Sequence, residues 1–144
     1  MVKAVFIDYM GTTVNEHSNA PVFPDASTFF GQCPVPIYII TNNGLPYMER
    51  ALRRNGLKAA GVVSADAARA YKPHREIFDE ALRISGCTPS EVTHIGDSYD
   101  TDVVGSRGAG IRPVLLLRGR ARRHDDVDAA DGLEQVLELV FKRS

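Results

Sequence analysis

The sequence predicts an α/β domain built on a parallel β-sheet with helices on both faces. Short apolar runs alternate along the chain with longer segments of helical periodicity, as in proteins whose parallel strands are connected by helices. The apolar runs are continuous and rich in Val and Ile, which is typical of strands that are covered on both faces. We predict strands at residues 3–8, 36–41, 61–64, 92–96 and 113–117, and helices at 25–32, 45–55, 74–86, 100–109 and 132–142.

Residues that favour helix ends support these assignments. Gly56 and Gly86 follow two predicted helices, where a left-handed cap is common. Pro73 lies where the first turn of a helix tolerates proline. Asp131 and Glu134 have the spacing of a capping box at the start of the last helix.

Length and composition indicate one globular domain, residues 1–144. The chain is 44% hydrophobic and 24% charged, which is ordinary for a soluble protein with its own core. Its net charge of −1 gives no general attraction to nucleic acid or to an anionic membrane. Cys33 and Cys87 lack metal-ligand spacing and are expected to be buried thiols. No apolar run approaches the about 20 residues that span a bilayer, and Asp8 interrupts the first one, so we expect a cytoplasmic protein.

Two stretches show neither strand nor helix periodicity. Residues 15–24 are polar, contain two prolines and are predicted to be a connection without a core of its own. Residues 118–128 contain four arginines followed by one histidine and three aspartates. Such a charge pattern is typical of a solvated loop, and no aromatic residue is interleaved to stack on bases. We therefore expect no nucleic-acid partner.

Four polar clusters lie where predicted strands end or where a helix is about to begin. Because the carboxyl ends of parallel strands share one edge of a sheet, we expect the clusters to converge there. The clusters are Asp8 with Gly11, Thr12 and Thr13; Thr41 to Gly44; Lys72; and Gly96, Asp97 and Ser98 with Asp100 and Asp102.

The chemistry of these clusters is complementary. Carboxylates from two strands, Asp8 with Asp97 or Asp102, repel one another unless a cation lies between them, and hard oxygen ligands suit Mg²⁺. A hydroxyl group, turn amides and the Lys72 ammonium can hold the oxygens of a phosphoryl group. With its charge balanced in this way, Asp8 could attack phosphorus and form an aspartyl-phosphate.

The four clusters resemble the four motifs of the haloacid dehalogenase (HAD) superfamily. The resemblance extends from Val2 to about Leu117. It is carried by Asp8-x-x-Gly-Thr-Thr, Thr41-Asn42, Lys72-Pro73, and Gly96-Asp97-Ser98 followed by Asp102. The resemblance implies a Rossmann-like three-layer core.

It also implies a role for each matching residue. Asp8 would be the nucleophile, and Mg²⁺ would be bound by Asp8, Asp97 and the carbonyl of Met10. Asp102 would support the metal through water. The residues that would hold the phosphoryl group and the substrate are Thr41, Lys72, Gly11, Thr12 and Asn42.

Met10 departs from the phosphatase pattern of this family. Phosphatases of the family carry a second aspartate at this position as general acid and base, and that help is worth about 10²–10⁴-fold in rate. A thioether cannot transfer a proton, so turnover would be slow. The first motif is similar to that of the phosphonatase-like branch, whose Schiff-base lysine comes from a cap. Here no lysine lies between Lys3 and Lys58.

The chain is also too short between its motifs for the cap domain of such relatives. Only residues 9–40 separate the first motif from the second, and residues 42–71 separate the second from Lys72. We expect the cap to be absent or reduced to a join at residues 15–24, either naturally or by removal. An open site favours a macromolecular substrate or closure by another subunit, and exposed apolar surface at the crevice would promote oligomerisation.

Three functions therefore stay open. The first is a Mg²⁺-dependent phosphatase that acts on a phosphorylated small molecule or macromolecule. The second is a core that binds metal or phosphate without efficient turnover. The third is hydrolysis of a carbon–phosphorus or carbon–halogen bond. Outside the motifs, His94 is predicted to be a hydrogen-bonded core histidine, and no membrane partner is expected.

Overall fold

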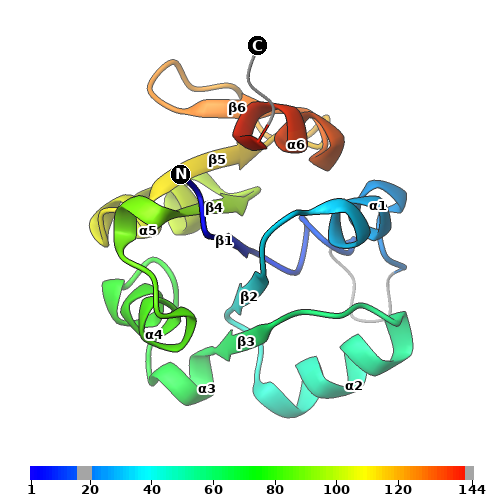
Figure 1. The fold of residues 1–144 in the computed structure, drawn as a ribbon, viewed down its shortest axis with the longest axis vertical. Coiled ribbons are helices and arrows are strands. Elements are labelled where there is room, and N and C mark those ends of the chain that lie inside the picture. The colour runs from blue at the N-terminus through cyan, green and yellow to red at the C-terminus, as the bar shows by residue number, and fades with distance from the viewer. Residues whose placement is uncertain (16–20, 142–144) are drawn as a thin grey trace.

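A six-stranded parallel sheet forms the centre of the molecule in the computed structural model, which describes residues 1–15 and 21–141 (Figure 1). The strand order is β3-β2-β1-β4-β5-β6, and every pairing is parallel. The chain therefore winds outward from β1 in both directions, which confirms the predicted α/β class. The strands are β1 (Ala4–Ile7), β2 (Ile37–Thr41), β3 (Gly61–Ser64), β4 (Val92–Gly96), β5 (Arg112–Leu116) and β6 (Asp128–Ala130).

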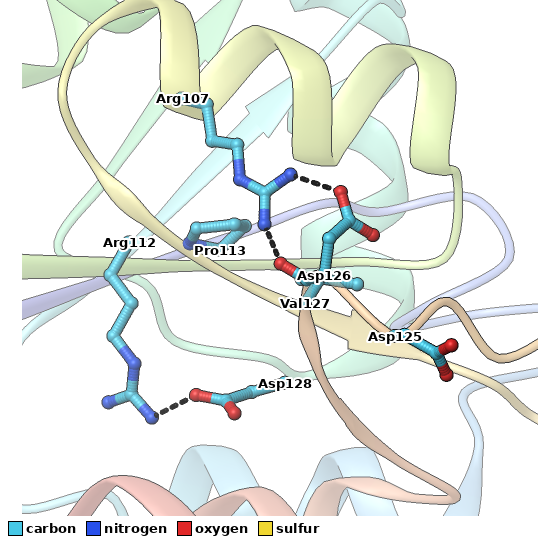
Figure 2. Close-up of a pocket in the computed structure, with 7 residues that line it drawn as sticks. All are labelled: Arg107, Arg112, Pro113, Asp125, Asp126, Val127 and Asp128. Carbon is cyan, nitrogen blue, oxygen red and sulfur yellow. Dashed lines mark hydrogen bonds and ion pairs between the residues drawn. The ribbon is translucent and has the colours of Figure 1, made fainter.

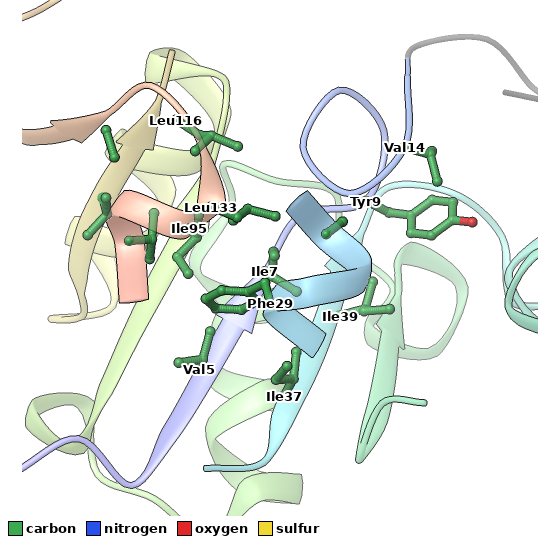
Figure 3. Close-up of a cluster of buried hydrophobic side chains, with 14 of the residues drawn as sticks. Val5, Ile7, Tyr9, Val14, Phe29, Ile37, Ile39, Ile95, Leu116 and Leu133 are labelled. Carbon is green, nitrogen blue, oxygen red and sulfur yellow. The ribbon is translucent and has the colours of Figure 1, made fainter. Parts of the chain in front are cut away.

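Helices cover both faces of this sheet. Buried side chains of α1, α2 and α6 pack on one face, against alternate residues of β1 and β2 (Figure 3). Side chains of α4 pack on the other face, against the residues of β1 and β2 that point the opposite way. The helices are α1 (Pro24–Gln32), α2 (Leu45–Asn55), α3 (Ala65–Ala68), α4 (Arg75–Ser85), α5 (Val104–Gly108) and α6 (Leu133–Phe141). Among the helices described, none has both the length and the apolar character that crossing a membrane requires.

The predicted strands and the longer helices are confirmed to within one residue of their bounds, save that residue 142 lies outside the described part. Three elements were missed: β6, α3 and the 3₁₀ turn Pro89–Glu91. The predicted helix 100–109 is a π turn at Tyr99–Val103 that continues into α5. The predicted left-handed caps are present at Gly56 and Gly86. The cysteines are free thiols, as predicted, but they are half-buried.

The connection between β1 and α1 is closed by backbone contacts at its two ends. Val14 forms isolated bridges with Met10 on one side and with Val22 on the other. The Phe23 amide donates a hydrogen bond to the carbonyl of Thr13 at 3.0 Å. The two ends of the connection therefore lie side by side, whereas residues 16–20, the middle of the predicted join, are outside the described part.

Asp25, in the first turn of α1, joins α1 to the start of α6. Its Oδ2 accepts hydrogen bonds from the Leu133 amide at 2.8 Å and from Arg118 Nη1 at 2.7 Å. The capping contact at this end comes from Gln135, which accepts from the amide of Gly132 at 2.9 Å, and not from the predicted Asp131–Glu134 spacing. A carboxylate that is distant in sequence thus satisfies a free N–H of the last helix.

Replacing Asp25 with alanine is expected to lower the free energy of unfolding by about 3 kcal/mol, as measured by urea denaturation. The change leaves Arg118, whose side chain is only 9% exposed, without its carboxylate. Asp128→Ala is the matched control, because Asp128 forms an ion pair with Arg112 in which both side chains are exposed. We expect little effect from the control. Equal losses for the two variants would contradict a buried ion pair at Asp25.

Candidate functional site

Three carboxylates come together at the carboxyl edge of the sheet. Asp8 follows β1 and Asp97 follows β4, and these strands are direct neighbours in which Ile7 pairs with Ile95. Asp102 lies in the turn that follows β4. Each of the three offers an oxygen, and these oxygens all lie within 4.8 Å of one another. The convergence that the topology predicts is therefore present for these residues.

Lys72 lies between two of these carboxylates. Its Nζ donates to Asp8 Oδ1 at 2.7 Å and to Asp102 Oδ1 at 2.8 Å, and the lysine is buried. Asn42 holds the lysine in place, because its Oδ1 accepts from the Lys72 amide at 2.7 Å and its Nδ2 donates to the Lys72 carbonyl at 3.4 Å. Asn42, predicted to bind substrate, thus uses its side chain here to fix the backbone of Lys72.

The turn after β1 orients Asp8. Thr12 Oγ1 donates to Asp8 Oδ2 at 3.2 Å and lies 3.5 Å from Asp97 Oδ1. Thr13 Oγ1 donates to the Asp8 carbonyl at 2.8 Å. The Gly11 amide donates to the Val14 carbonyl at 2.7 Å. This amide, predicted to contribute to substrate binding, closes the turn here.

Gly11 is nevertheless required by the geometry of the site. Its φ is +84°, and a Cβ at this position would lie 2.3 Å from Asp97 Oδ2. Gly11→Ala is expected to displace the Asp97 carboxylate, to weaken metal binding measured by calorimetry, and to destabilise the protein by about 1–2 kcal/mol.

Gly31→Ala provides the control for that substitution. A Cβ on Gly31, which is in α1, would meet no atom within 4 Å. Alanine favours a helix more than glycine does, so this variant should be as stable as the wild type or slightly more stable. A Gly11→Ala variant that binds metal as tightly as Gly31→Ala would show that the close approach to Asp97 is unimportant.

Thr41 lies at the end of β2, next to β1 in the sheet. It is buried, and its Oγ1 accepts hydrogen bonds from the amide and the side-chain Nδ2 of Asn43, both at 3.1 Å. Asn43 therefore closes the turn after β2.

Met10 is half-buried, with its sulfur 3.9 Å from the hydroxyl of Tyr47 in α2. The position two residues after Asp8 thus presents a thioether that contacts a phenol hydroxyl. It supplies no acid or base of its own.

Asp102 is held from three sides. His94 Nε2 lies 2.9 Å from Asp102 Oδ1, and the Ser98 amide donates to Asp102 Oδ2 at 3.3 Å. His94 is fully buried, with its ring edge-on to Phe78 at 4.9 Å between centroids, which confirms the predicted core histidine. The Ser98 hydroxyl accepts from the Thr101 amide at 3.2 Å and stabilises this turn. Asp102 is thus a rigid partner of Lys72.

The charges of the site do not balance. Burial raises the pKa of Asp97 to about 7, and the nearby Asp8 and Asp102 carboxylates add to this effect. Burial also raises the pKa of Asp8, despite the opposing ammonium of Lys72. For Asp102, burial acts in the same direction, but Lys72 and His94 outweigh it and its pKa is lowered. For Lys72, burial lowers the pKa, but Asp102 and Asp8 outweigh it and the pKa is raised.

Lys72 lies between Asp8 and Asp102, and Arg120 Nη2 lies 3.6 Å from Asp97 Oδ2, so two cationic side chains face three carboxylates at this edge of the sheet. The acidic group has carboxylate oxygens from Asp8, Asp97 and Asp102 as donors, and hard divalent cations prefer such donors. The carbonyl of Met10, the other predicted ligand, belongs to the same turn as Asp8. The residues present fit a divalent cation, which would remove the charge imbalance.

Two arginines of the segment after β5 also reach the Asp8 turn. Arg120 Nη2 donates to the Gly11 carbonyl at 3.0 Å and lies 3.6 Å from Asp97 Oδ2. Arg118 donates through Nη2 to the Thr12 carbonyl. The prediction of a solvated loop is wrong for Arg118, whose side chain is only 9% exposed. Arg120 is exposed, as predicted, but it also contacts the site. No signal in the sequence separates them from the other arginines of the run.

A second polar hollow, of about 300 Å³, lies beside β5 (Figure 2). Its arginines face acidic partners. Arg107 Nη1 lies 2.8 Å from Asp126 Oδ2, and Arg112 Nη2 lies 2.9 Å from Asp128 Oδ2. The hollow contains none of the predicted site residues. Its ion pairs attach Asp126 to α5, and Asp128, the first residue of β6, to β5.

Sequence comparison supports the resemblance that the motifs suggested. Residues 70–140 match the HAD-hydrolase-like family. Phosphoserine phosphatase of Thermus thermophilus is 30% identical over 128 residues, which cover 82% of this chain and 49% of that protein. Glyceraldehyde 3-phosphate phosphatase of Methanothermobacter thermautotrophicus is 32% identical over 87 residues, or 55% of this chain and 38% of that protein. The chain belongs to the HAD superfamily. It spans less than half of the length of these curated relatives.

Solved structures match the fold over nearly the whole chain. A HAD phosphatase from Thermococcus onnurineus matches with a TM-score of 0.89 at 18% identity, over 99% of both chains. L-2-haloacid dehalogenase from Xanthobacter autotrophicus matches with a TM-score of 0.88 at 15% identity, over 100% of both chains. Phosphatases and dehalogenases share this HAD fold, so the reaction has to be argued from the site.

Proposed function

We propose that this HAD domain is a Mg²⁺-dependent phosphatase that hydrolyses phosphate monoesters through an aspartyl-phosphate on Asp8. The observation that carries this proposal is the cluster of Asp8, Asp97 and Asp102, in which buried Lys72 pairs with Asp8 and Asp102. This arrangement combines excess negative charge for a divalent cation with an ammonium group for a phosphoryl oxygen. A Mg²⁺ held by Asp8, Asp97 and the carbonyl of Met10 would neutralise phosphoryl charge and leave Asp8 ionised.

Each residue of the site then has its own role in the reaction. The Asp8 carboxylate attacks phosphorus while the bond to the ester oxygen breaks, and the alkoxide leaves. Lys72 stabilises the phosphoryl oxygens, as would the hydroxyls of Thr12 and Thr41. Water then attacks the phosphorus of the aspartyl-phosphate, which releases inorganic phosphate and regenerates Asp8.

Met10 makes the departure of the leaving group slow. No acid at this position protonates the leaving alkoxide, so that proton has to come from water. Esters with a good leaving group, such as aryl phosphates, should therefore react faster than alkyl phosphates. A core that binds metal and phosphate without turnover is the second candidate, and this same thioether, in contact with Tyr47, favours it.

We further propose that residues 1–144 act as one catalytic core in which the join at 15–24 stands in place of a cap. The substrate would be a phosphorylated small molecule or macromolecule that reaches an open site. A second subunit over this edge of the sheet could provide cover.

Phosphate release from an aryl phosphate tests the function directly. We expect release that requires Mg²⁺ and stops when the metal is chelated. If the protein binds Mg²⁺ but releases phosphate from no member of a broad monoester panel, the phosphatase proposal fails and the non-catalytic alternative is favoured.

Metal binding should be visible as a pH-dependent thermal shift. Mg²⁺ at about 100 times its Kd should stabilise the protein by about 2.7 kcal/mol, and thus raise its Tm. Because the pKa of Asp97 is raised to about 7 without metal, protons compete with the cation below that pH. The Tm shift should therefore be large near pH 8 and shrink towards pH 6.

The Asp97→Asn variant serves as the control for this measurement. It should show little Tm shift at either pH, because it lacks one ligand. An equal shift in this variant and in the wild type would place the metal elsewhere.

A further inference from the structure

Arg120 borders a small cavity next to the predicted metal ligand Asp97. The cavity has a volume of about 270 Å³ and is lined by Asp97, Leu117, Arg120 and Ala121. The Arg120 side chain is 40% exposed, so the guanidinium is accessible from the cavity. The position combines a cation, an apolar wall and direct proximity to the carboxylate cluster.

The neighbouring Arg118 shows what a purely structural arginine looks like in this segment. Its side chain is 9% exposed, pairs with Asp25 and donates to the Thr12 carbonyl. Its guanidinium also stacks on the ring of Phe23 at 3.9 Å. Arg118 thus anchors the segment to α1 and to the Asp8 turn. Arg120, two residues further on, also contacts the Asp8 turn, but its side chain is far more exposed.

The charge around Arg120 changes when the site is loaded as proposed above. Without metal, Arg120 Nη2 lies 3.6 Å from Asp97 Oδ2, and its hydrogen bond at 3.0 Å goes to the neutral Gly11 carbonyl. A divalent cation on Asp97 would neutralise this carboxylate. Arg120 would remain a cation at the border of the cavity, beside whatever part of the substrate enters it.

We propose that this cavity binds a second anionic group of the substrate, carried by the leaving group, and that Arg120 recognises it. The proposal rests on the phosphatase function proposed above. A guanidinium presents N–H donors in a planar fork that matches a carboxylate or a phosphate. The substrate class is thus a phosphate monoester with a nearby carboxylate or second phosphate, and its carbon chain lies against Leu117 and Ala121.

A comparison of two matched esters distinguishes recognition of the second anion by Arg120 from the support that Arg120 gives to the turn after β1. In 3-phosphoglycerate a carboxylate stands where glycerol 3-phosphate has a hydroxymethyl group. We expect Arg120→Ala to lower kcat/KM for 3-phosphoglycerate by about 10-fold or more, mainly through KM. For glycerol 3-phosphate we expect a clearly smaller loss, which reflects only the support that Arg120 gives to the Gly11 carbonyl. Arg120→Lys should retain part of the preference, because it keeps the charge without the fork.

Arg122→Ala is the control for general electrostatics, because Arg122 is exposed in the same segment. This variant should have the wild-type kcat/KM for both esters. If Arg120→Ala lowers kcat/KM for both esters by the same factor, Arg120 only supports the Gly11 carbonyl, and the proposal is overturned.

Binding of non-hydrolysable analogues tests the inference without turnover. In these analogues a methylene group replaces the ester oxygen, and calorimetry in Mg²⁺ measures their affinity. The carboxylate analogue should bind the wild type more tightly than the hydroxymethyl analogue, and Arg120→Ala should remove the difference. Equal affinities in the wild type would overturn the subsite, whereas the phosphatase proposal fails separately if no ester is hydrolysed. A third analogue carries a phosphonate in place of the carboxylate: tighter binding than that of the carboxylate analogue, lost in Arg120→Ala, would identify the second group as a phosphate.

Discussion

Replacing Lys72 with methionine is expected to lower the free energy of unfolding by about 3–5 kcal/mol in the absence of divalent metal. The substitution keeps much of the apolar stem but removes the ammonium group between Asp8 and Asp102, both 2.8 Å or less from Nζ. The buried carboxylates of Asp8 and Asp102 then lack a positive partner, and the Asp97 carboxylate lies next to them. Urea denaturation in the presence of a chelator measures the effect.

Two further measurements show whether the loss comes from charge. Mg²⁺ should recover part of the stability of Lys72→Met, because a cation again lies among the carboxylates. A second change, Asp102→Asn in the same chain, should also recover part of it. Lys3→Met is the matched control: Lys3 forms an exposed ion pair with Glu91 at 2.7 Å, and its loss should have little effect. A Lys72→Met protein as stable as this control would contradict the buried network.

Replacing Asp8 with asparagine is expected to lower phosphatase turnover by a factor of about 10⁴ or more. The amide has nearly the shape of the carboxylate but cannot attack phosphorus, so Thr12 and Lys72 remain without a nucleophile to orient. The fold should survive, because the change removes one of three crowded carboxylates. Phosphate release from an aryl phosphate gives the rate, and intact-protein mass spectrometry of the wild type should detect a phosphorylated intermediate that the variant lacks.

Asp79→Asn is the matched control for this change. Asp79 is on α4, exposed, and forms an ion pair with Arg75. This variant should keep wild-type turnover. Turnover in Asp8→Asn that equals the control would mean that another group is the nucleophile.

Much of the fold follows from local sequence patterns. β1 and β2 are continuous apolar runs that polar residues bring to an end, and their bounds could be predicted closely for that reason. Because parallel strands share a carboxyl edge, the meeting of Asp8 and Asp97 also follows from the order of elements. β6 could not be predicted, since Asp128–Ala130 is a short edge strand without an apolar run.

The support of the site depends on packing between distant loops. Asn42 lies thirty positions before Lys72, and only the folded arrangement brings its amide to the backbone of the lysine. The same is true of Arg118 and Arg120, which look like any other charges in a loop until that loop folds over the turn after β1. Motif residues can therefore be predicted from spacing, whereas their partners require the tertiary structure.

The paired ends of the connection at Val14 and Val22 have a consequence for how the protein can change in length. Because these residues bridge each other, the chain between them starts and finishes at one place. Extending a flexible loop costs little closure entropy, only about 0.6 kcal/mol for each doubling of its length. A longer segment, even a folded module, can thus be inserted there while Asp8 keeps its position. This point of the chain is therefore a suitable insertion site for a domain that selects the substrate.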